Sequence, residues 1–147
     1  MRQIFGVSDN TKEVEALLPH RPPFLFVDEI VEASRERIAA RHVFAEDEFF
    51  FKGHFPDYPV VPGVILLETM AQSGGAGLRK LGLIADGGLF FLASIDKVKF
   101  RRQVRPGEEV RSEIQNLRIS ATAIKQSGKI FVGDELAAEA EWLCMAG

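Results

Sequence analysis

The sequence has a single cysteine, Cys144, so no disulfide can form within the chain. No group of cysteines and histidines has the spacing of a zinc site, and we expect no metal or redox cofactor. Residues 1–10 also lack the apolar run of a secretory signal peptide. These absences predict a protein of a reducing compartment, and we expect it to be cytoplasmic.

An excess of basic residues is also absent. The chain has 18 Lys and Arg against 21 Asp and Glu, a formal net charge of −3, which gives no support to nucleic-acid binding by bulk attraction. The most apolar stretch, residues 60–83, is interrupted by Glu68, Gln72, Arg79 and Lys80. Charges near the centre of a span are costly in lipid, so the stretch predicts a buried helix and no membrane partner.

Linkers, repeats and low-complexity tracts are missing as well. The length of 147 residues, with 46% hydrophobic and 27% charged residues, predicts one globular domain over residues 1–147. Tryptophan and tyrosine occur once each, but phenylalanine occurs 12 times. That bias predicts either an apolar cavity or interface, or simply a core rich in phenylalanine.

Two helices are predicted. A short one starts at Asn10 as its cap, with Glu13 three residues on, and runs towards Leu18. A long one covers Gly63–Leu81, follows a proline, and is apolar nearly all round, which indicates burial. Its three glycines weaken a helix, so we expect close approach of neighbouring segments at Gly74, Gly75 and Gly77.

Strands account for most of the remaining chain. They are predicted over 24–33, 37–44, 89–100, 109–125 and 129–145, with turns at 105–108 and 126–128. In the last strand one face carries Leu136, Ala138, Ala140, Trp142 and Cys144, and the other carries Glu135, Glu139 and Glu141. A buried helix with long antiparallel strands predicts an α+β protein whose sheet wraps the helix.

His54 and Glu68 are the candidate acid–base groups. His54 lies in a loop stiffened by Pro56 and Pro59, where Gly53 allows close approach or an unusual backbone angle. Glu68 lies among apolar residues, and Gln72 one turn later is placed to orient it by a hydrogen bond. The alternatives are a loop histidine that only packs, and a Glu68–Gln72 stripe that faces water.

Two further features have both a structural and a functional interpretation. The backbone N–H groups of Gly63 and Val64 open the long helix and could hold a carbonyl oxygen as it gains charge, or simply bind water. A basic run on one strand face is either a solvated surface or a docking patch for an acidic partner; it comprises Lys97, Lys99, Arg101, Arg102 and Arg105. His20 and His42 are interpreted as structural.

Three blocks of residues together resemble a known family. They are Leu18-Pro19-His20-Arg21-Pro22-Pro23-Phe24-Leu25, then Gly53-His54-Phe55-Pro56 with Pro62-Gly63-Val64 and Glu68-Thr69-Met70-Ala71-Gln72, and Ile95 to Arg102 with Val104 and Pro106-Gly107. This combination resembles the bacterial (3R)-hydroxyacyl-[acyl carrier protein] dehydratases of the hotdog fold, the FabZ type. Glutamate rather than aspartate at position 68 favours this type over the related dehydratase-isomerases.

The resemblance implies a central helix wrapped by an antiparallel sheet, and loss of water from a 3-hydroxyacyl group carried by acyl carrier protein in fatty-acid biosynthesis. It implies that His54 and Glu68 are catalytic and meet across a homodimer, with a trimer of dimers as the common assembly. The acyl chain is expected in an apolar tunnel walled by phenylalanines. The chain departs from the family pattern at Glu29, Asp57, Tyr58, Val61 and Ser94; the changes at 29, 57 and 58 make that neighbourhood less basic.

Two rival functions remain open from the sequence. A thioesterase of the same fold would hydrolyse the thioester with a carboxylate and water, and would release a free thiol. A non-catalytic acyl-binding module would bind the thioester without turnover.

Overall fold

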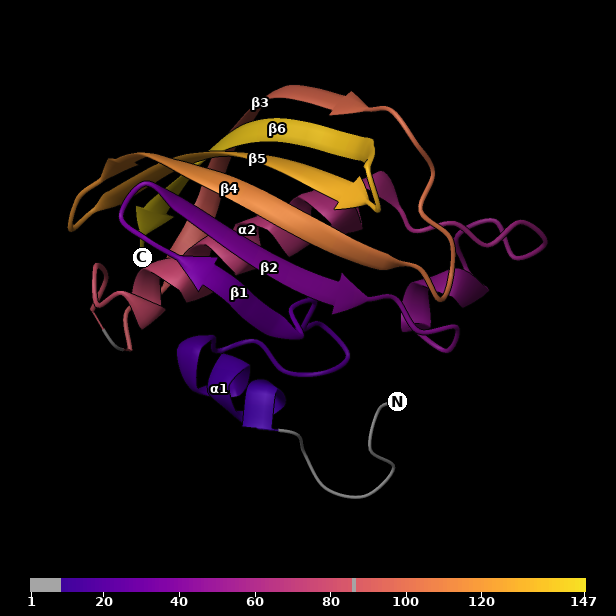
Figure 1. Cartoon of the computed structure of the whole chain (residues 1–147), viewed down its shortest axis with the longest axis horizontal. Helices are drawn as coiled ribbons and strands as arrows, with labels where there is room; N and C mark the ends of the chain where they lie inside the picture. Colours follow the sequence, from indigo (N-terminus) through magenta and orange to yellow (C-terminus); the bar gives the residue numbers. More distant parts are fainter. Residues whose placement is uncertain (1–8, 86) are drawn as a thin grey trace.

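A six-stranded antiparallel sheet curves around one long helix (Figure 1). The computed structural model describes residues 9–85 and 87–147. The elements are α1 (Asp9–Leu17), β1 (Glu29–Ala33), β2 (Arg37–Val43), the 3-10 turn η1 (Phe49–Lys52), α2 (Gly63–Lys80), β3 (Phe90–Phe100), β4 (Glu109–Ile119), β5 (Ala123–Val132) and β6 (Glu135–Ala146). The strand order is β1-β2-β4-β5-β6-β3, so β1 and β3 form the edges.

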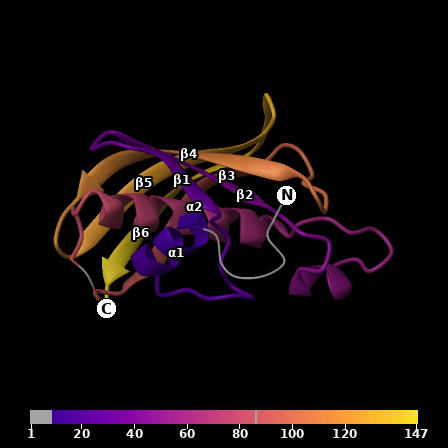
Figure 2. The same cartoon turned by 60° about the horizontal axis from the view of Figure 1, so that its bottom comes forward.

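Helix α2 lies under the concave face of the sheet, and α1 packs beside it near β1 (Figure 2). The inward side chains of α2 include Ile65, Leu66, Met70 and Leu78, all buried in the main core. The α+β class and the wrapped helix predicted from the sequence are confirmed. Among the described residues, no helix combines the length and apolar character needed to cross a membrane.

Close packing explains two of the three helix glycines. A Cβ at Gly77 would lie 2.5 Å from the side chain of Ile38, and one at Gly74 would lie 2.2 Å from Gln126. Gly75 has only Leu18 at 4.0 Å, so close approach does not require a glycine there. The predicted contact of neighbouring segments is therefore confirmed at positions 74 and 77.

The predicted division of the last strands was wrong. Residues 126–128 lie inside β5, and the turns fall at Ser120–Thr122 and at Gly133-Asp134. Position 128 has no room for a side chain, because a Cβ there would come within 2.6 Å of the Trp142 ring. Gln126 is buried, and its Oε1 accepts a hydrogen bond of 3.1 Å from Trp142 Nε1. These turn-forming residue types serve packing within the sheet.

The observed starts of α1 and β1 also differ from the predicted ones. Helix α1 begins at Asp9, so Asn10 lies in its first turn rather than at the cap. Strand β1 begins at Glu29 rather than at residue 24. Among the residues before β1, Phe26 bonds to a side chain of α2, because its N–H donates to Gln72 Oε1 at 2.8 Å.

Candidate active site

His54 is held in the loop between η1 and α2. Its backbone N–H donates to the carbonyl of Phe50 at 2.9 Å, and its Nδ1 lies 3.0 Å from the carbonyl oxygen of Val60. A carbonyl only accepts hydrogen bonds, so Nδ1 carries the hydrogen and Nε2 is left as the basic nitrogen. Gly53 has neither an unusual backbone angle, since its φ is −109°, nor a close neighbour, since no described atom lies within 4 Å of a Cβ built there. The positive φ occurs instead at Phe55, at +53°.

Glu68 projects from α2 and is oriented by Gln72. The Gln72 Nε2 donates to Glu68 Oε2 at 2.9 Å, which confirms the predicted hydrogen bond. Gln72 is itself buried and fixed, because its Oε1 accepts from Phe26 N–H and its Nε2 lies 3.2 Å from the Phe24 carbonyl. The Glu68 carboxylate is therefore half-buried with one defined donor, and does not belong to a water-facing polar stripe.

The first turn of α2 presents free donors. Ile65 and Leu66 are the first residues whose N–H groups bond back to Pro62 O, at 2.9 and 3.3 Å. The N–H groups of Gly63 and Val64 precede that ladder and have no acceptor among the residues that the structure describes. The helix dipole adds partial positive charge at this point, which suits an oxygen that gains negative charge.

The structure places the predicted site residues in two cavities. The first, here named the His54 cavity, has a volume of about 520 Å³ and is lined by His54, Gly63, Val64 and the segment from Phe100 to Val104. The second, named the Glu68 cavity, has a volume of about 430 Å³ and contains Glu68 and Gln72. His54 and the helix start are thus brought together, but one chain does not bring His54 to Glu68.

Apolar side chains form most of the Glu68 cavity. They include Leu18, Phe24, Ile84, Leu89, Phe90, Phe91, Leu92 and Ile124. Three phenylalanines therefore line the Glu68 cavity, whereas Phe26, Phe44, Phe50 and Phe51 are buried in the main core. Both interpretations of the phenylalanine bias hold, for different residues. Cys144 also lines this cavity, and burial, with Glu68 nearby, raises the pKa of its thiol to about 11.

His20 is the site residue that sequence reasoning missed. It was interpreted as structural, but it lines the Glu68 cavity with its Nε2 at 3.6 Å from Glu68 Oε2. Burial lowers its pKa; the negative charge of Glu68 opposes that shift, and the positive charges of Arg21 and Arg79 add to it. The available signal was its place in the Pro-His-Arg block of the resemblance, which lies far from Glu68 in the sequence.

His42 has the structural role predicted for it. Its Nδ1 lies 2.9 Å from Asp28 Oδ1 and its Nε2 lies 3.4 Å from Glu48 Oε1. Burial alone lowers the pKa of His42, but hydrogen bonding and the charges of Asp28 and Glu48 outweigh it, and the pKa is raised. The imidazole packs edge-on against Phe44.

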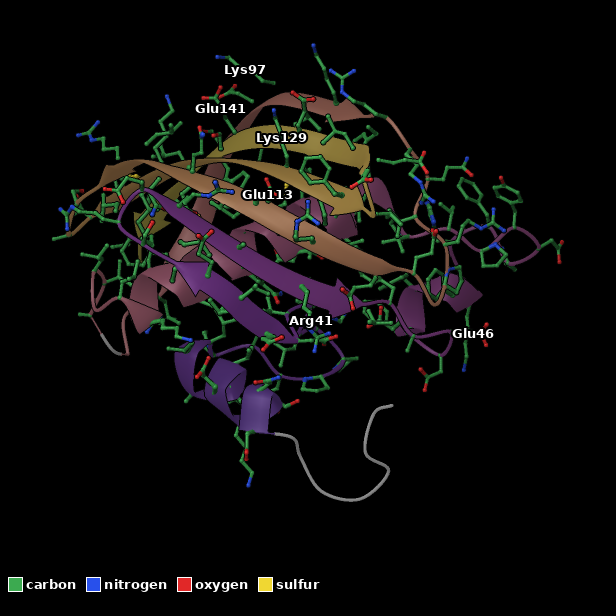
Figure 3. The ribbon with its side chains drawn as sticks, in the orientation of Figure 1. Arg41, Glu46, Lys97, Glu113, Lys129 and Glu141 are labelled. Atoms are coloured by element: carbon green, nitrogen blue, oxygen red, sulfur yellow. The ribbon has the colours of Figure 1, made fainter. Side chains whose placement is uncertain are left out.

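The basic run on β3 carries carboxylate partners. Lys97 pairs with Glu141 at 2.9 Å (Figure 3). Arg101 pairs with Glu139 at 2.8 Å, and Lys99 is opposite Glu139 in the β3–β6 register. The three basic side chains therefore share a face, as predicted, although a bulge interrupts the register between Asp96 and Lys99.

Arg102 lies beyond the end of β3. It holds Glu108 through two hydrogen bonds, of 2.9 and 2.8 Å. Arg105 stacks over the Tyr58 ring, with 4.3 Å from its Cζ to the ring centroid. Arg101 and Arg102 also line the His54 cavity, so basic groups border the opening beside His54. Among the described residues, no cluster of three or more His, Cys, Asp or Glu could hold a metal ion.

Solved structures with the same arrangement define the class as a hotdog-fold protein. The dehydratase heterocomplex ApeI:P from Xenorhabdus doucetiae superposes with a TM-score of 0.79 at 19% identity, covering 91% of this chain and 90% of that chain. A hypothetical thioesterase with coenzyme A from Streptococcus pneumoniae superposes with a TM-score of 0.60 at 10% identity, covering 81% and 84%. At these identities the likeness concerns the fold alone.

Sequence relatives then fix the family. A family model for the FabA-like domain matches residues 18–141. The 3-hydroxyacyl-[acyl-carrier-protein] dehydratase FabZ of Pelotomaculum thermopropionicum is 45% identical over 131 residues, covering 88% of this chain and 92% of that protein. The FabZ of Koribacter versatilis is 45% identical over 144 residues, covering 97% and 90%. The chain belongs to the FabA-like family, as a FabZ-type dehydratase.

Proposed function

We propose that the chain removes water from (3R)-3-hydroxyacyl-[acyl carrier protein] to give the trans-2-enoyl thioester in fatty-acid biosynthesis, in a site shared by two subunits. The relatives that carry this activity in their names match over most of the chain. The observation that carries the shared site is the separation of His54 and Glu68 into different cavities of one chain. Acid–base catalysis needs both groups within hydrogen-bond reach of one substrate.

The edge strand β3 supports a dimer. It has a strand partner on one side only, β6, and it exposes Phe91, Leu92, Ile95 and Phe100. An apolar edge strand of this length invites pairing with another chain, and a two-fold dimer would cover it on both copies. Phe91 and Leu92 line the Glu68 cavity and Phe100 lines the His54 cavity, so such pairing would bring the two kinds of cavity towards one interface. A trimer of these dimers is the assembly implied by the family resemblance.

The proposed reaction uses the two half-sites together. His54 Nε2 takes the proton from C2, and the N–H groups of Gly63 and Val64 stabilise the thioester oxygen as it gains negative charge. The C3–O bond breaks, and the departing hydroxyl takes a proton from the partner's Glu68 to leave as water. The C2=C3 double bond forms. Solvent then removes the proton from His54 and restores the one on Glu68. Gln72 orients the acid.

Substrate binding is assigned to the remaining surfaces. The acyl chain lies along the apolar walls of the Glu68 cavity, because apolar contact is the main source of affinity for such a chain. Acyl carrier protein docks at Lys97, Lys99, Arg101 and Arg102, of which the last two border the His54 cavity. Three of these groups already have carboxylate partners within the chain, so a new ion pair with the carrier would add little to the final affinity. We therefore expect the patch to act mainly on the rate of encounter. With its single cysteine, the chain needs no oxidising compartment, in keeping with a cytoplasmic location.

A product assay tests the proposed function against its rivals. The purified protein is incubated with a carrier-linked (3R)-3-hydroxyacyl group, and enoyl thioester and free thiol are measured in parallel. Dehydration predicts the enoyl product without thiol release. Thiol release without the enoyl product would establish a thioesterase, and tight binding without either product would establish an acyl-binding module.

A further inference from the structure

His20 and Glu68 face one another inside the Glu68 cavity. The His20 Nε2 lies 3.6 Å from Glu68 Oε2, and the two side chains are 32% and 21% exposed. This separation is slightly longer than a hydrogen bond, and such contacts commonly tighten when substrate binds and expels water. His20 comes from the segment between α1 and β1, whereas Glu68 lies on α2, so tertiary folding alone brings them together.

Gln72 determines what His20 can do at this carboxylate. Because Gln72 Oε1 accepts from Phe26 N–H, its Nε2 is the atom that donates to Glu68 Oε2. The His20 imidazole approaches the same oxygen. Two donors on Oε2 leave Oε1 as the oxygen that holds and transfers a proton.

The loop that carries His20 is itself anchored. The Arg21 guanidinium donates to the carbonyl oxygens of Leu18 and His20, at 2.8 and 2.7 Å. The His20 Nδ1 is buried and has no hydrogen-bond partner among the described residues. With no group competing for the other ring nitrogen, the contact with Glu68 is the polar interaction available to this side chain.

We propose that His20 is a positioning residue for Glu68, and that its Nε2–H donates to Oε2 so that Oε1 delivers the proton to the departing hydroxyl. This inference rests on the proposed dehydratase function. An uncharged imidazole can donate Nε2–H while the proton for transfer stays on Glu68, and burial favours that form of His20. The other ionisable groups near the pair are Arg21, Arg79 and Cys144, and burial raises the pKa of the Cys144 thiol to about 11, which keeps it neutral.

A matched pair of variants tests the donor. Gln and Met have similar length and flexibility, but only His20→Gln keeps an N–H that can reach Oε2. We expect His20→Met to lower kcat about 10-fold to 100-fold, the usual effect of losing one donor to a charged group, with a smaller change in KM. We expect His20→Gln to stay within about fivefold of wild type. All measurements use the full chain in its native assembly, with size-exclusion elution as the check on folding.

The pH profile separates positioning from a merely structural role. A carboxylate that loses a donor holds its proton to higher pH, so the alkaline limb of the kcat profile of His20→Met moves upward by about one pH unit. The limb of His20→Gln stays in place. Equal losses in both variants, or an unmoved limb in His20→Met, would overturn the inference. If His20→Met does not assemble, His20→Gln still tests the inference, because a large loss of kcat in His20→Gln would overturn it. A wild-type protein that forms no enoyl product would instead overturn the proposed function, and this inference with it.

Discussion

Mixing two inactive variants tests whether the active site is shared between subunits. His54→Ala removes the base from the His54 cavity, and Glu68→Gln removes the acid from the Glu68 cavity. Each variant alone should lose at least about 100-fold in kcat, because a positioned acid or base typically contributes that much. Neither residue lies in the buried core, so both proteins should fold.

The expected recovery follows from the geometry of a two-fold dimer. In a hybrid dimer, one site combines both defects, and the other combines the intact His54 of the Glu68→Gln chain with the intact Glu68 of the His54→Ala chain. Random assortment makes about half of the dimers hybrid, and each hybrid has one working site of two. The mixture should therefore recover about one quarter of wild-type activity.

The assay co-expresses the two variants with different affinity tags and purifies the hybrids through both tags in sequence. If the protein is a free dimer, the doubly purified material should then have about half of wild-type activity per dimer; in a trimer of dimers each doubly tagged particle also holds parental dimers, and the recovery should stay near one quarter. A mixture and a doubly tagged fraction that stay as inactive as the parents would refute the shared site. A hybrid of His54→Ala with a tagged wild-type chain is the control, since it reports any effect of tagging or exchange.

Three further predictions concern stability and docking. Replacing Gly128 with Ala should lower the free energy of unfolding by about 1–3 kcal/mol in chemical denaturation, because its Cβ would meet Trp142 and Ile114, whereas Gly53→Ala, with no atom within 4 Å, should change it little. The raised pKa of His42 means that its charged form stabilises the fold fully below the ordinary value of 6.5, and that this stability is lost as pH rises through the higher folded-state pKa. Denaturation midpoints measured across that window should fall with rising pH in wild type and less in His42→Gln; an equal slope in both would contradict the assignment. Reversing Lys97, Lys99 and Arg102 to Glu should lower kcat/KM for carrier-linked substrates by about 10-fold or more, but not for short thioester analogues, and equal effects on both would argue against docking at this patch.

The sequence predicted the parts of the fold that depend on local pattern. The apolar character of α2 set its position to within one residue of the observed end, and the alternation in β6 placed Trp142 inward and Glu139 and Glu141 outward. It failed at residues 126–128, where Ser127 and Gly128 are of residue types common in turns. The positions of Gln126 and Gly128 are decided by a hydrogen bond to Trp142 and by the space under its ring, and neither is visible in a local window.

The candidate site divides in the same way. His54, Gly63 and Glu68 were predicted because each stands out from its neighbours in the sequence, and the Glu68–Gln72 hydrogen bond followed from helical spacing. His20 does not stand out in this way, and its partner Glu68 is on another element. The same limit applies to the two cavities, because spacing along the chain does not show that His54 and Glu68 line different cavities.

The grouping of residues in the two cavities explains how an active site divided between two subunits, as proposed, could work. In the proposed mechanism each cavity holds one set of groups: the His54 cavity holds the base together with the oxyanion donors of Gly63 and Val64, and the Glu68 cavity holds the acid together with Gln72. The base and the oxyanion donors act on the same thioester and must agree most closely in position, and this proposal takes both from one chain. In the proposed dimer only the acid, which acts on the neighbouring carbon, comes from the partner. A small error in subunit packing therefore displaces proton delivery to the hydroxyl and leaves enolate formation intact. Orientation of Glu68 is the step that most needs support from its own chain, and Gln72 and His20 both approach its carboxylate.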